Sequence, residues 1–313
     1  MILVTGGAGF IGSNIVKGLN ERGVDDIFIC DNLENGTKHK NLNRLNFKDY
    51  IDKADFDAES FFNKNNIEAV FHQGACSSTT ESNGKYMMKN NYECTKNILH
   101  ACIKHNVRLF YASSASVYGN GDNGFKETPE CEYPLNVYAF SKYQFDRYLL
   151  GIMSTINTQV VGLRYFNVYG PQENHKGKMA SVAFHMFNQI KNGERMKLFE
   201  GSENFRRDFI HVDDVVSVNM FFYENKHLSG IYNCGTGNAE SFCRIAEALQ
   251  EIYPDAAVDT IPFPDTLKGK YQTYTQADMS KLREAGYNKE FITLSEGTKK
   301  YAKILEDCGG YLI

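Results

Sequence analysis

The chain has 313 residues and carries 34 Lys and Arg against 38 Asp and Glu, which gives a formal net charge of −4. This charge offers no general attraction to nucleic acid or to an anionic membrane, so neither is predicted as a partner. Hydrophobic residues make up 42% and charged residues 23%, a balance that excludes a disordered chain. We expect one large α/β unit or two unequal lobes.

The start of the chain and its cysteines bear on localisation. Residues 2–5 run directly into glycines, without the basic and long apolar regions of a signal peptide. The eight cysteines are dispersed and form no Cys-x-x-Cys pair, so we expect free thiols in a reducing, cytoplasmic environment. The eight histidines form no spaced ligand cluster, and no metal site is predicted.

Apolar runs typical of buried strands alternate with amphipathic segments of helical length through the first half of the chain. This rhythm predicts βαβ units and a parallel sheet. From about residue 171 the pattern becomes less regular. The expected strands are 2–5, 27–30, 69–72, 109–112, 160–163, 197–199 and 231–233, and the expected helices are 9–22, 85–105, 138–153, 181–192, 212–224 and 241–252.

A glycine-rich turn follows the first expected strand. Its glycines fit both G-x-x-G-x-x-G, through Gly6, Gly9 and Gly12, and G-x-G-x-x-G, through Gly7, Gly9 and Gly12. Glycines at these positions let the backbone approach a pyrophosphate, whose charge then lies at the positive end of a helix. A glycine-rich turn without a ligand is the alternative, but Asp31 at the end of the second strand favours binding.

Together these signals predict a Rossmann-type doubly wound parallel sheet with a second, smaller α/β substrate lobe. We expect the dinucleotide-binding domain over residues 1–170, with returns near 208–235. The substrate-binding lobe is expected mainly over residues 171–313.

Asp31 is expected to face the adenosine ribose, where a carboxylate favours NAD by bonding the 2′-hydroxyl. Asn32, Lys38 and Lys53 could hold a 2′-phosphate instead, and each lysine could equally be solvated. A loop of small residues at the carboxyl edge of the third strand is expected to line the same crevice, which Asn90 would also reach. That loop comprises Gln73, Gly74, Ala75, Cys76 and Ser77.

Tyr138 and Lys142 stand four residues apart at an expected helix start, so they share one helix face. Tyr92 and Lys96 repeat this spacing. A strand end rich in hydroxyl groups places Ser114 24 residues before Tyr138, whereas nothing comparable precedes Tyr92. The sequence therefore predicts catalytic chemistry at Ser114, Tyr138 and Lys142.

These motifs resemble the extended short-chain dehydrogenase/reductase family, which carries Ser or Thr, Tyr and Lys at these spacings behind an N-terminal T-G-x-x-G-x-x-G. Within that family, residues 74–81, 164–171, 175–177 and 199–205 are similar to the ADP-heptose epimerases. The resemblance implies inversion at C-6″ of an ADP-heptose, with tightly bound NADP and with NAD as the alternative. It also implies a role in supplying heptose for the lipopolysaccharide inner core, and a homo-oligomer for which a pentamer is one candidate.

The resemblance assigns roles residue by residue. Tyr138 matches the active-site tyrosine, Lys142 its lysine partner, Ser114 the serine, and Lys176 a second acid/base, for which phosphate binding is the alternative. Lys178 departs from the family, where a small polar residue is expected. Implied cofactor contacts are Phe10, Ile11, Asp31, Asn32, Lys38, Lys53, the 73–77 loop, Asn90 and Val168, and implied substrate contacts are Asn167, Lys178, His185, Phe199, Glu200, Gly201, Ser202, Arg207 and Tyr271.

The expected chemistry explains the need for two acid/base groups. Inverting a carbinol carbon that is not acidic requires temporary oxidation and the return of hydride to the opposite face. The ketone must turn between these steps, so its oxygen meets a second group, which we expect to be Lys176 beside Tyr138. Lys142 is expected to lower the pKa of Tyr138, and Ser114 to hydrogen-bond the reacting oxygen.

Three rival functions remain. A dehydratase of the same superfamily would carry Thr-Asp-Glu where this chain has Ser114, Ala115 and Ser116, so the carboxylate pair is missing. A hexose 4-epimerase of the UDP-galactose type would fit Tyr138, but residues 175–177 favour the heptose branch. A non-catalytic dinucleotide-binding protein would commonly lack the tyrosine or the lysine, and both are present.

Overall fold

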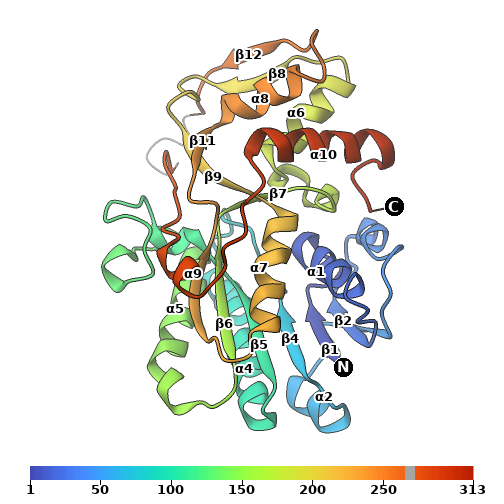
Figure 1. Cartoon of the computed structure of the whole chain (residues 1–313), viewed down its shortest axis with the longest axis vertical. Coiled ribbons are helices and arrows are strands. Elements are labelled where there is room, and N and C mark those ends of the chain that lie inside the picture. The colour runs from blue at the N-terminus through green and yellow to red at the C-terminus, as the bar shows by residue number, and fades with distance from the viewer. Residues whose placement is uncertain (265–271, 313) are drawn as a thin grey trace.

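The computed structural model describes residues 1–264 and 272–312, and a parallel seven-stranded sheet lies at its centre (Figure 1). The strand order is β10-β6-β5-β4-β1-β2-β3, which is a doubly wound order with its reversal at β1 and β4. The predicted fold class is therefore confirmed. The strands are β1 (Ile2–Thr5), β2 (Ile27–Asp31), β3 (Asp49–Asp52), β4 (Ala69–His72), β5 (Arg108–Ser114), β6 (Val160–Tyr165) and β10 (Gly230–Cys234).

The central strands form because their side chains are apolar on both faces, as is typical of parallel strands covered by helices. Every residue of β1, β4 and β6 is buried. Ile2 pairs with Ile27 on one side and with Ala69 on the other, so β1 lies between β2 and β4.

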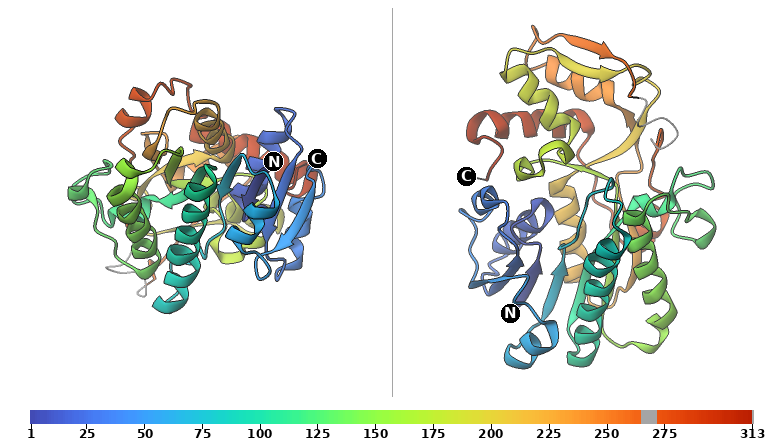
Figure 2. Two further views of the ribbon diagram at one scale, coloured as in Figure 1. Left: turned by 90° about the horizontal axis from the view of Figure 1, so that it is seen from below. Right: turned by 180° about the vertical axis from the view of Figure 1, so that it is seen from behind.

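Helices cover both faces of the sheet. Two helices, α1 (Phe10–Asn20) and α7 (Val212–Glu224), pack on one face and share a core with β1, β2 and β6. On the other face lie α2 (Ala58–Lys64), α4 (Cys94–His105) and α5 (Val137–Ile152), which Figure 2 shows from behind. This is the three-layer arrangement of an open α/β sheet.

The expected helix over 85–105 is interrupted. It consists of α3 (Gly84–Met87), a π-helix (Met88–Glu93) and α4 in direct succession. Short 3₁₀ helices occur at Gly36–Asn41, Ala115–Tyr118, Pro129–Cys131, Met153–Thr155 and Asn174–Met179.

A second group of elements lies beyond the carboxyl ends of the sheet strands, in the upper part of Figure 1. Its helices enclose a separate core that includes Met186, Leu249 and Tyr301. A three-stranded sheet, ordered β11-β9-β7, connects this group to the first. The elements are β7 (Asn167–Tyr169), α6 (Val182–Lys191), β8 (Met196–Phe199), β9 (Arg206–His211), β11 (Ala239–Ser241), α8 (Phe242–Gln250), β12 (Val258–Ile261) and α10 (Leu294–Cys308). Helix α9 (Ser280–Glu284) lies with the first group instead, where its Leu282 packs in the core of the large sheet.

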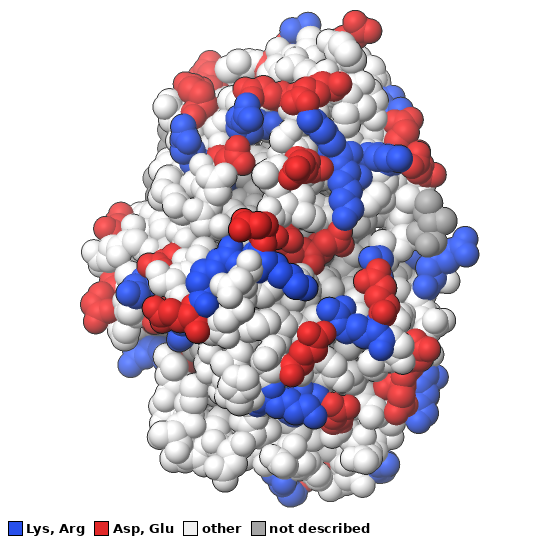
Figure 3. Space-filling model, viewed as in Figure 1, with Lys and Arg blue, Asp and Glu red and all other residues white. Residues whose placement is uncertain are grey.

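The chain returns to the first group after residue 171, because α7 covers the large sheet and β10 pairs with β6. The division at residues 170 and 171 stays a prediction. Acidic and basic side chains are interspersed on the face that Figure 3 shows. Among the described residues, no helix combines the length and apolarity that crossing a bilayer demands.

Candidate active site

The glycine turn between β1 and α1 is closed by contacts that only glycine permits. Gly6 has φ of +67°, in the left-handed region that favours glycine. A Cβ on Gly12 would lie 2.1 Å from the carbonyl oxygen of Gly6, and one on Gly9 would lie 3.1 Å from it. The first turn of α1 therefore packs directly on the loop, and its free backbone N–H groups face the sheet edge where a pyrophosphate would bind.

Asp31 ends β2 beside this turn, and both oxygens of its carboxylate have partners within the chain. It accepts hydrogen bonds from the backbone N–H groups of Ala8 (2.8 Å) and Asn32 (2.7 Å). The Lys38 ammonium lies 2.5 Å from the same carboxylate and also donates to the carbonyl oxygen of Asn32 at 2.7 Å. The structure thus brings Asp31, Asn32 and Lys38 together, and their contact with a cofactor stays a prediction.

The loop over 73–77 lies against the glycine turn. A Cβ on Gly6 would be 2.6 Å from the backbone nitrogen of Gly74. The Gly74 N–H lies 3.2 Å from the Thr5 hydroxyl, which accepts its hydrogen bond. Both amide atoms of Gln73 are buried and form no hydrogen bond to any described residue, although Tyr165 is close enough for this amide to lower its pKa. Ala75 and Ser77 are exposed, and Cys76 is half-buried.

Asn91 in the π-helix holds this loop. Its amide accepts from the backbone N–H of Cys76 at 2.8 Å and donates to the Cys76 carbonyl oxygen at 3.0 Å. It also donates to the Ser141 hydroxyl at 3.0 Å, and that hydroxyl donates to the Tyr138 carbonyl oxygen at 2.7 Å. The neighbouring Asn90, which the sequence favours for this crevice, accepts a hydrogen bond from the Lys53 ammonium at 3.3 Å.

Tyr138 lies in the first turn of α5, which Asn136 caps by accepting from the Ala139 N–H at 2.9 Å. Its hydroxyl lies close enough to the hydroxyl of Ser114, the last residue of β5, for Ser114 to lower its pKa. Lys142 follows one turn later, buried, and donates to the carbonyl oxygen of Ala112 at 2.7 Å. The structure therefore brings Ser114 and Tyr138 together at the carboxyl edge of the sheet.

The electrostatics of this trio differ from the sequence-based expectation. Burial raises the pKa of Tyr138, and the nearby Ser114 hydroxyl lowers it in part. The expected lowering by Lys142 does not appear among the interactions of the described residues. Burial also lowers the pKa of Lys142 to about 8, against the opposing charge of Asp146. Burial thus disfavours the charged form of both side chains.

Lys176 lies at the glycine turn. Its ammonium is 4.9 Å from the centre of the Phe10 ring and 3.6 Å from the Glu173 carboxylate. The preceding residue, His175, contacts Asn41 at 3.3 Å, and its pKa falls to about 4, chiefly because of burial and then because of Lys38. No contact between Lys176 and Tyr138 is formed among the described residues.

The remaining candidates for substrate contact are spread over the second group of elements. Phe199 ends β8, and its carbonyl oxygen accepts from the Ser202 hydroxyl. Arg207 is buried on β9, and His185 is half-buried on α6. Asn167, Lys178 and Glu200 are exposed, and Gly201 has a positive φ. Two of the expected cofactor contacts, Ile11 and Val168, pack against the core of the large sheet. Tyr271 lies outside the described residues.

The structure identifies four buried polar residues that the sequence analysis missed. His72 contacts the hydroxyls of Thr5 at 2.6 Å and Thr95 at 2.9 Å, and burial lowers its pKa to about 3, so it is neutral. The others are Asn41, Asn91 and Glu173. Their local sequence context carries no signal, because polar residues in polar stretches are usually exposed.

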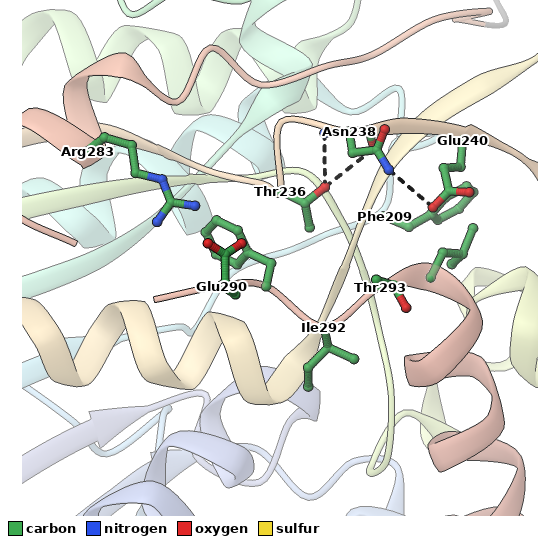
Figure 4. Close-up of a pocket in the computed structure, with 10 residues that line it drawn as sticks. Phe209, Thr236, Asn238, Glu240, Arg283, Glu290, Ile292 and Thr293 are labelled. Carbon is green, nitrogen blue, oxygen red and sulfur yellow. Dashed lines mark hydrogen bonds between the residues drawn. The ribbon is translucent and has the colours of Figure 1, made fainter. Parts of the chain in front are cut away.

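A cavity of about 180 Å³ lies elsewhere, beside the start of α10 and above α7 (Figure 4). It contains no candidate residue of the site. For that reason we do not assign the reaction to it. Its lining includes Phe209, Thr236, Glu240, Arg283, Glu290 and Thr293.

A glycine turn on a doubly wound sheet, with a serine, a tyrosine and a buried lysine at the strand ends, defines a dinucleotide-dependent enzyme of the extended short-chain type. Residues 2–235 match the NAD dependent epimerase/dehydratase family, and the chain belongs to that family.

Comparison with individual proteins is more specific. The chain is 70% identical to ADP-L-glycero-D-manno-heptose-6-epimerase from Brachyspira hyodysenteriae, and the alignment covers 100% of both chains. The crystal structure of the Helicobacter pylori enzyme of the same name superposes with a TM-score of 0.84 at 32% identity, covering 98% of this chain and 96% of that one. UDP-glucose 4-epimerase from Thermotoga maritima gives a TM-score of 0.82 at 31% identity, over 97% and 98% of the chains. The resemblance to ADP-heptose epimerases is therefore confirmed over the full length.

Family membership makes a nicotinamide dinucleotide the cofactor class, and the residues present fit it. The glycines at positions 6, 9 and 12 leave no room for side chains beside the helix start. The buried Gln73 amide offers a donor and an acceptor without partners among the described residues. Unpaired buried amides are costly, so a ligand that engages them is expected.

Proposed function

We propose that the chain converts ADP-D-glycero-β-D-manno-heptose into ADP-L-glycero-β-D-manno-heptose by inverting C-6″, and that it supplies heptose for the lipopolysaccharide inner core. The observation that carries this proposal is the Tyr138 hydroxyl, which lies close to Ser114 and one helical turn from the buried Lys142. The 70% identity to a heptose 6-epimerase supports the choice of substrate.

A bound nicotinamide would accept hydride from C-6″ and return it, so no net redox change results. Tyr138 would take the hydroxyl proton during oxidation. Only the phenolate form of Tyr138 can take this proton, and burial opposes that form in the free chain by raising the pKa. The positive charge of a bound oxidised nicotinamide would favour the phenolate. Ser114 would hold the reacting oxygen, and Lys142 would fix the ribose of the cofactor while it donates to Ala112.

Lys176 would act as the second acid/base group, which meets the ketone oxygen after the ketone has turned. The ammonium is tied to the glycine turn through Phe10 and is one-quarter exposed, so substrate can reach it. Phosphate binding is the competing role, since the same turn is the expected pyrophosphate site. Replacement by Met distinguishes the roles, because loss of an acid/base group slows hydrogen transfer to bound substrate, whereas loss of a phosphate ligand weakens binding.

The direct test supplies purified protein with ADP-D-glycero-β-D-manno-heptose and no added cofactor, and follows the C-6″ configuration by NMR. We expect equilibration of the two epimers. UDP-glucose, supplied in parallel, tests the 4-epimerase alternative that the Thermotoga maritima structure represents. An unchanged heptose spectrum, with dinucleotide shown to be bound, would contradict the proposal, and so would faster conversion of UDP-glucose.

We infer that the cofactor is NADP. Both carboxylate oxygens of Asp31 are engaged within the protein, and Lys38 adds a cation beside them. This arrangement suits a 2′-phosphate better than a free ribose hydroxyl, which needs an available carboxylate. Denaturing the purified protein and identifying the released dinucleotide by mass spectrometry tests the inference, and recovery of NAD alone would overturn it.

We further propose a cytoplasmic homo-oligomer, with a pentamer as one candidate. All eight cysteines are free thiols, which suits a reducing compartment. Exposed apolar side chains near the start of α5 offer surface for a neighbouring copy. These are Tyr86, Tyr133, Leu135 and Phe140, and light scattering of the purified protein would give the number of copies.

A further inference from the structure

Glu173 is a fully buried carboxylate, with 0% of its surface exposed, at the junction between the two groups of elements. It follows the buried Gln172, whose backbone has φ of +78°. Buried carboxylates are uncommon and are retained only with hydrogen bonds and a countercharge.

Both oxygens of this carboxylate have partners. Ser181 donates to one through its backbone N–H at 2.7 Å and to the other through its hydroxyl at 2.5 Å. The Lys176 ammonium supplies the countercharge at 3.6 Å. The Tyr301 hydroxyl lies close by, since its pKa is raised first by burial and then by the Glu173 charge.

Lys176 is held at both ends by this arrangement. Its backbone N–H donates to the Glu173 carbonyl oxygen at 2.9 Å, and its ammonium lies between the Glu173 carboxylate and the Phe10 ring. The lysine side chain would otherwise be free to sample many rotamers, and an acid/base group must be within about 3 Å of the proton it transfers.

We propose that Glu173 is a positioning residue that holds the Lys176 ammonium in place for its part in the reaction. The proposal rests on the proposed function, in which Tyr138 and Lys176 each exchange a proton with the oxygen on C-6″, one before and one after the ketone turns. It follows that removing the Glu173 charge affects one direction of hydride transfer and not the other. A purely structural role, such as fastening Ser181 at the start of α6, would affect both directions alike.

The experiment uses the holoenzyme and follows reduction of the bound dinucleotide in a single turnover, by absorbance, with each of the two 6-epimers separately. Lys176→Met identifies the epimer whose oxidation needs Lys176. Glu173→Gln is expected to slow oxidation of that same epimer about tenfold or more and to leave the other within about twofold, because misplacing a reacting group by a fraction of an ångström has costs of this size.

Two control variants separate positioning from stability. Glu194→Gln removes a carboxylate that pairs with Lys197 at 3.0 Å with the same spacing of three residues, but both side chains are exposed, so neither half-reaction should change. Ser181→Ala removes a Glu173 partner and the side-chain cap of α6, so it should lower the melting temperature without producing the asymmetry. If Glu173→Gln does not fold, Glu173→Asp decides by the same measurement.

The outcomes distinguish this proposal from the one on which it rests. If Lys176→Met is asymmetric but Glu173→Gln slows both epimers equally or neither, Glu173 has no positioning role. If Lys176→Met is itself symmetric, the assignment of Lys176 as second acid/base fails, and the positioning role fails with it. If the wild-type protein reduces its dinucleotide with neither epimer, the proposed function is wrong.

Discussion

Lys142 shows how burial sets the chemistry of a single residue. The side chain is 6% exposed, and burial lowers the pKa of its ammonium from 10.5 to about 8. Asp146, one turn further along α5, opposes this change but also belongs to another ion pair, at 2.9 Å from Arg164. Keeping this cation buried therefore costs the folded chain free energy.

We expect Lys142→Met to stabilise the protein when it has been stripped of dinucleotide. The pKa of Lys142 in the folded chain lies below its ordinary value of 10.5. Between pH 8 and 10.5 the unfolded chain therefore binds one proton more than the folded chain. The penalty is therefore complete below pH 8 and vanishes as the pH rises to 10.5. At pH 7 the variant should gain on the order of 2–3 kcal/mol, while losing epimerase activity.

Urea unfolding of both proteins at a series of pH values measures this difference. The Lys142→Met advantage should shrink across pH 8 to 10.5. Burial raises the pKa of Cys30 from 9.0 to about 12, so this thiol titrates in the range only in the unfolded chain. Its contribution is common to both proteins and cancels in the comparison. A stability difference that does not change with pH would contradict the assignment.

At the scale of elements, the π-helix at Met88–Glu93 explains how the cofactor loop is held. A π-turn adds one residue to a helix and shifts the faces that follow, and such turns are common at functional sites. Here it directs Asn91 toward the backbone of Cys76 and toward Ser141. One buried amide thus links the 73–77 loop to the helix that carries Tyr138.

Asn91→Ala should therefore loosen the loop and weaken dinucleotide binding. The change removes three hydrogen bonds and leaves buried backbone groups of Cys76 unpaired, at a cost of about 2–4 kcal/mol. Asn97→Ala, at an exposed position of α4, is the control and should have little effect. Thermal unfolding and titration with dinucleotide check both, and equal behaviour of the two variants would rule out the link.

The sequence predicted the elements of the sheet well and those of the second lobe less completely. The strands at Ile2–Thr5 and Ala69–His72 and the helix at Val212–Glu224 agree residue for residue with the expected ranges. Strand β9 (Arg206–His211) was missed, because its charged residues hide the strand pattern. The helix at Leu294–Cys308 was missed as well, although a capping box at Thr293 and Glu296 marks its start.

Those features of the candidate site that depend on the spacing of residues along the sequence were predictable. Those that depend on how deeply a side chain is buried were not. Ser114 and Tyr138 meet as their positions after a strand and at a helix start require. The balance between burial and the Lys142 charge could not be read from the sequence, because it depends on how far each group lies from water. The same holds for Glu173, whose burial results from packing against distant residues.

For the molecule as a whole, Asn41 joins the two groups of elements at the cofactor turn. Its buried amide donates to the carbonyl oxygens of Ala8 at 3.0 Å and Gln172 at 3.1 Å. The Gln172 side chain donates in return to the Asn41 carbonyl oxygen at 3.0 Å. The glycine turn and the segment that carries Lys176 are thereby held in one arrangement.

Asn41→Ala should uncouple these two segments. We expect a loss of about 2–3 kcal/mol in unfolding free energy, because carbonyl groups of both segments lose a buried donor. Dinucleotide should dissociate faster, since Ala8 lies within the turn that would bind it. Asn43→Ala, an exposed neighbour, serves as the control. Unchanged dinucleotide release from Asn41→Ala in a stopped-flow experiment would show that the link plays no part in retention.

Strand β10 is translated long after its partner β6, and this affects how the nascent chain folds. Strand β6 is buried along its whole length, but its outer partner β10 begins only at Gly230. While the ribosome makes the intervening residues, β6 remains an apolar edge strand, the kind of surface that pairs with other chains. We expect nascent chains that end before residue 230 to aggregate or to engage chaperones, and full-length chains to be released from them once β10 has paired.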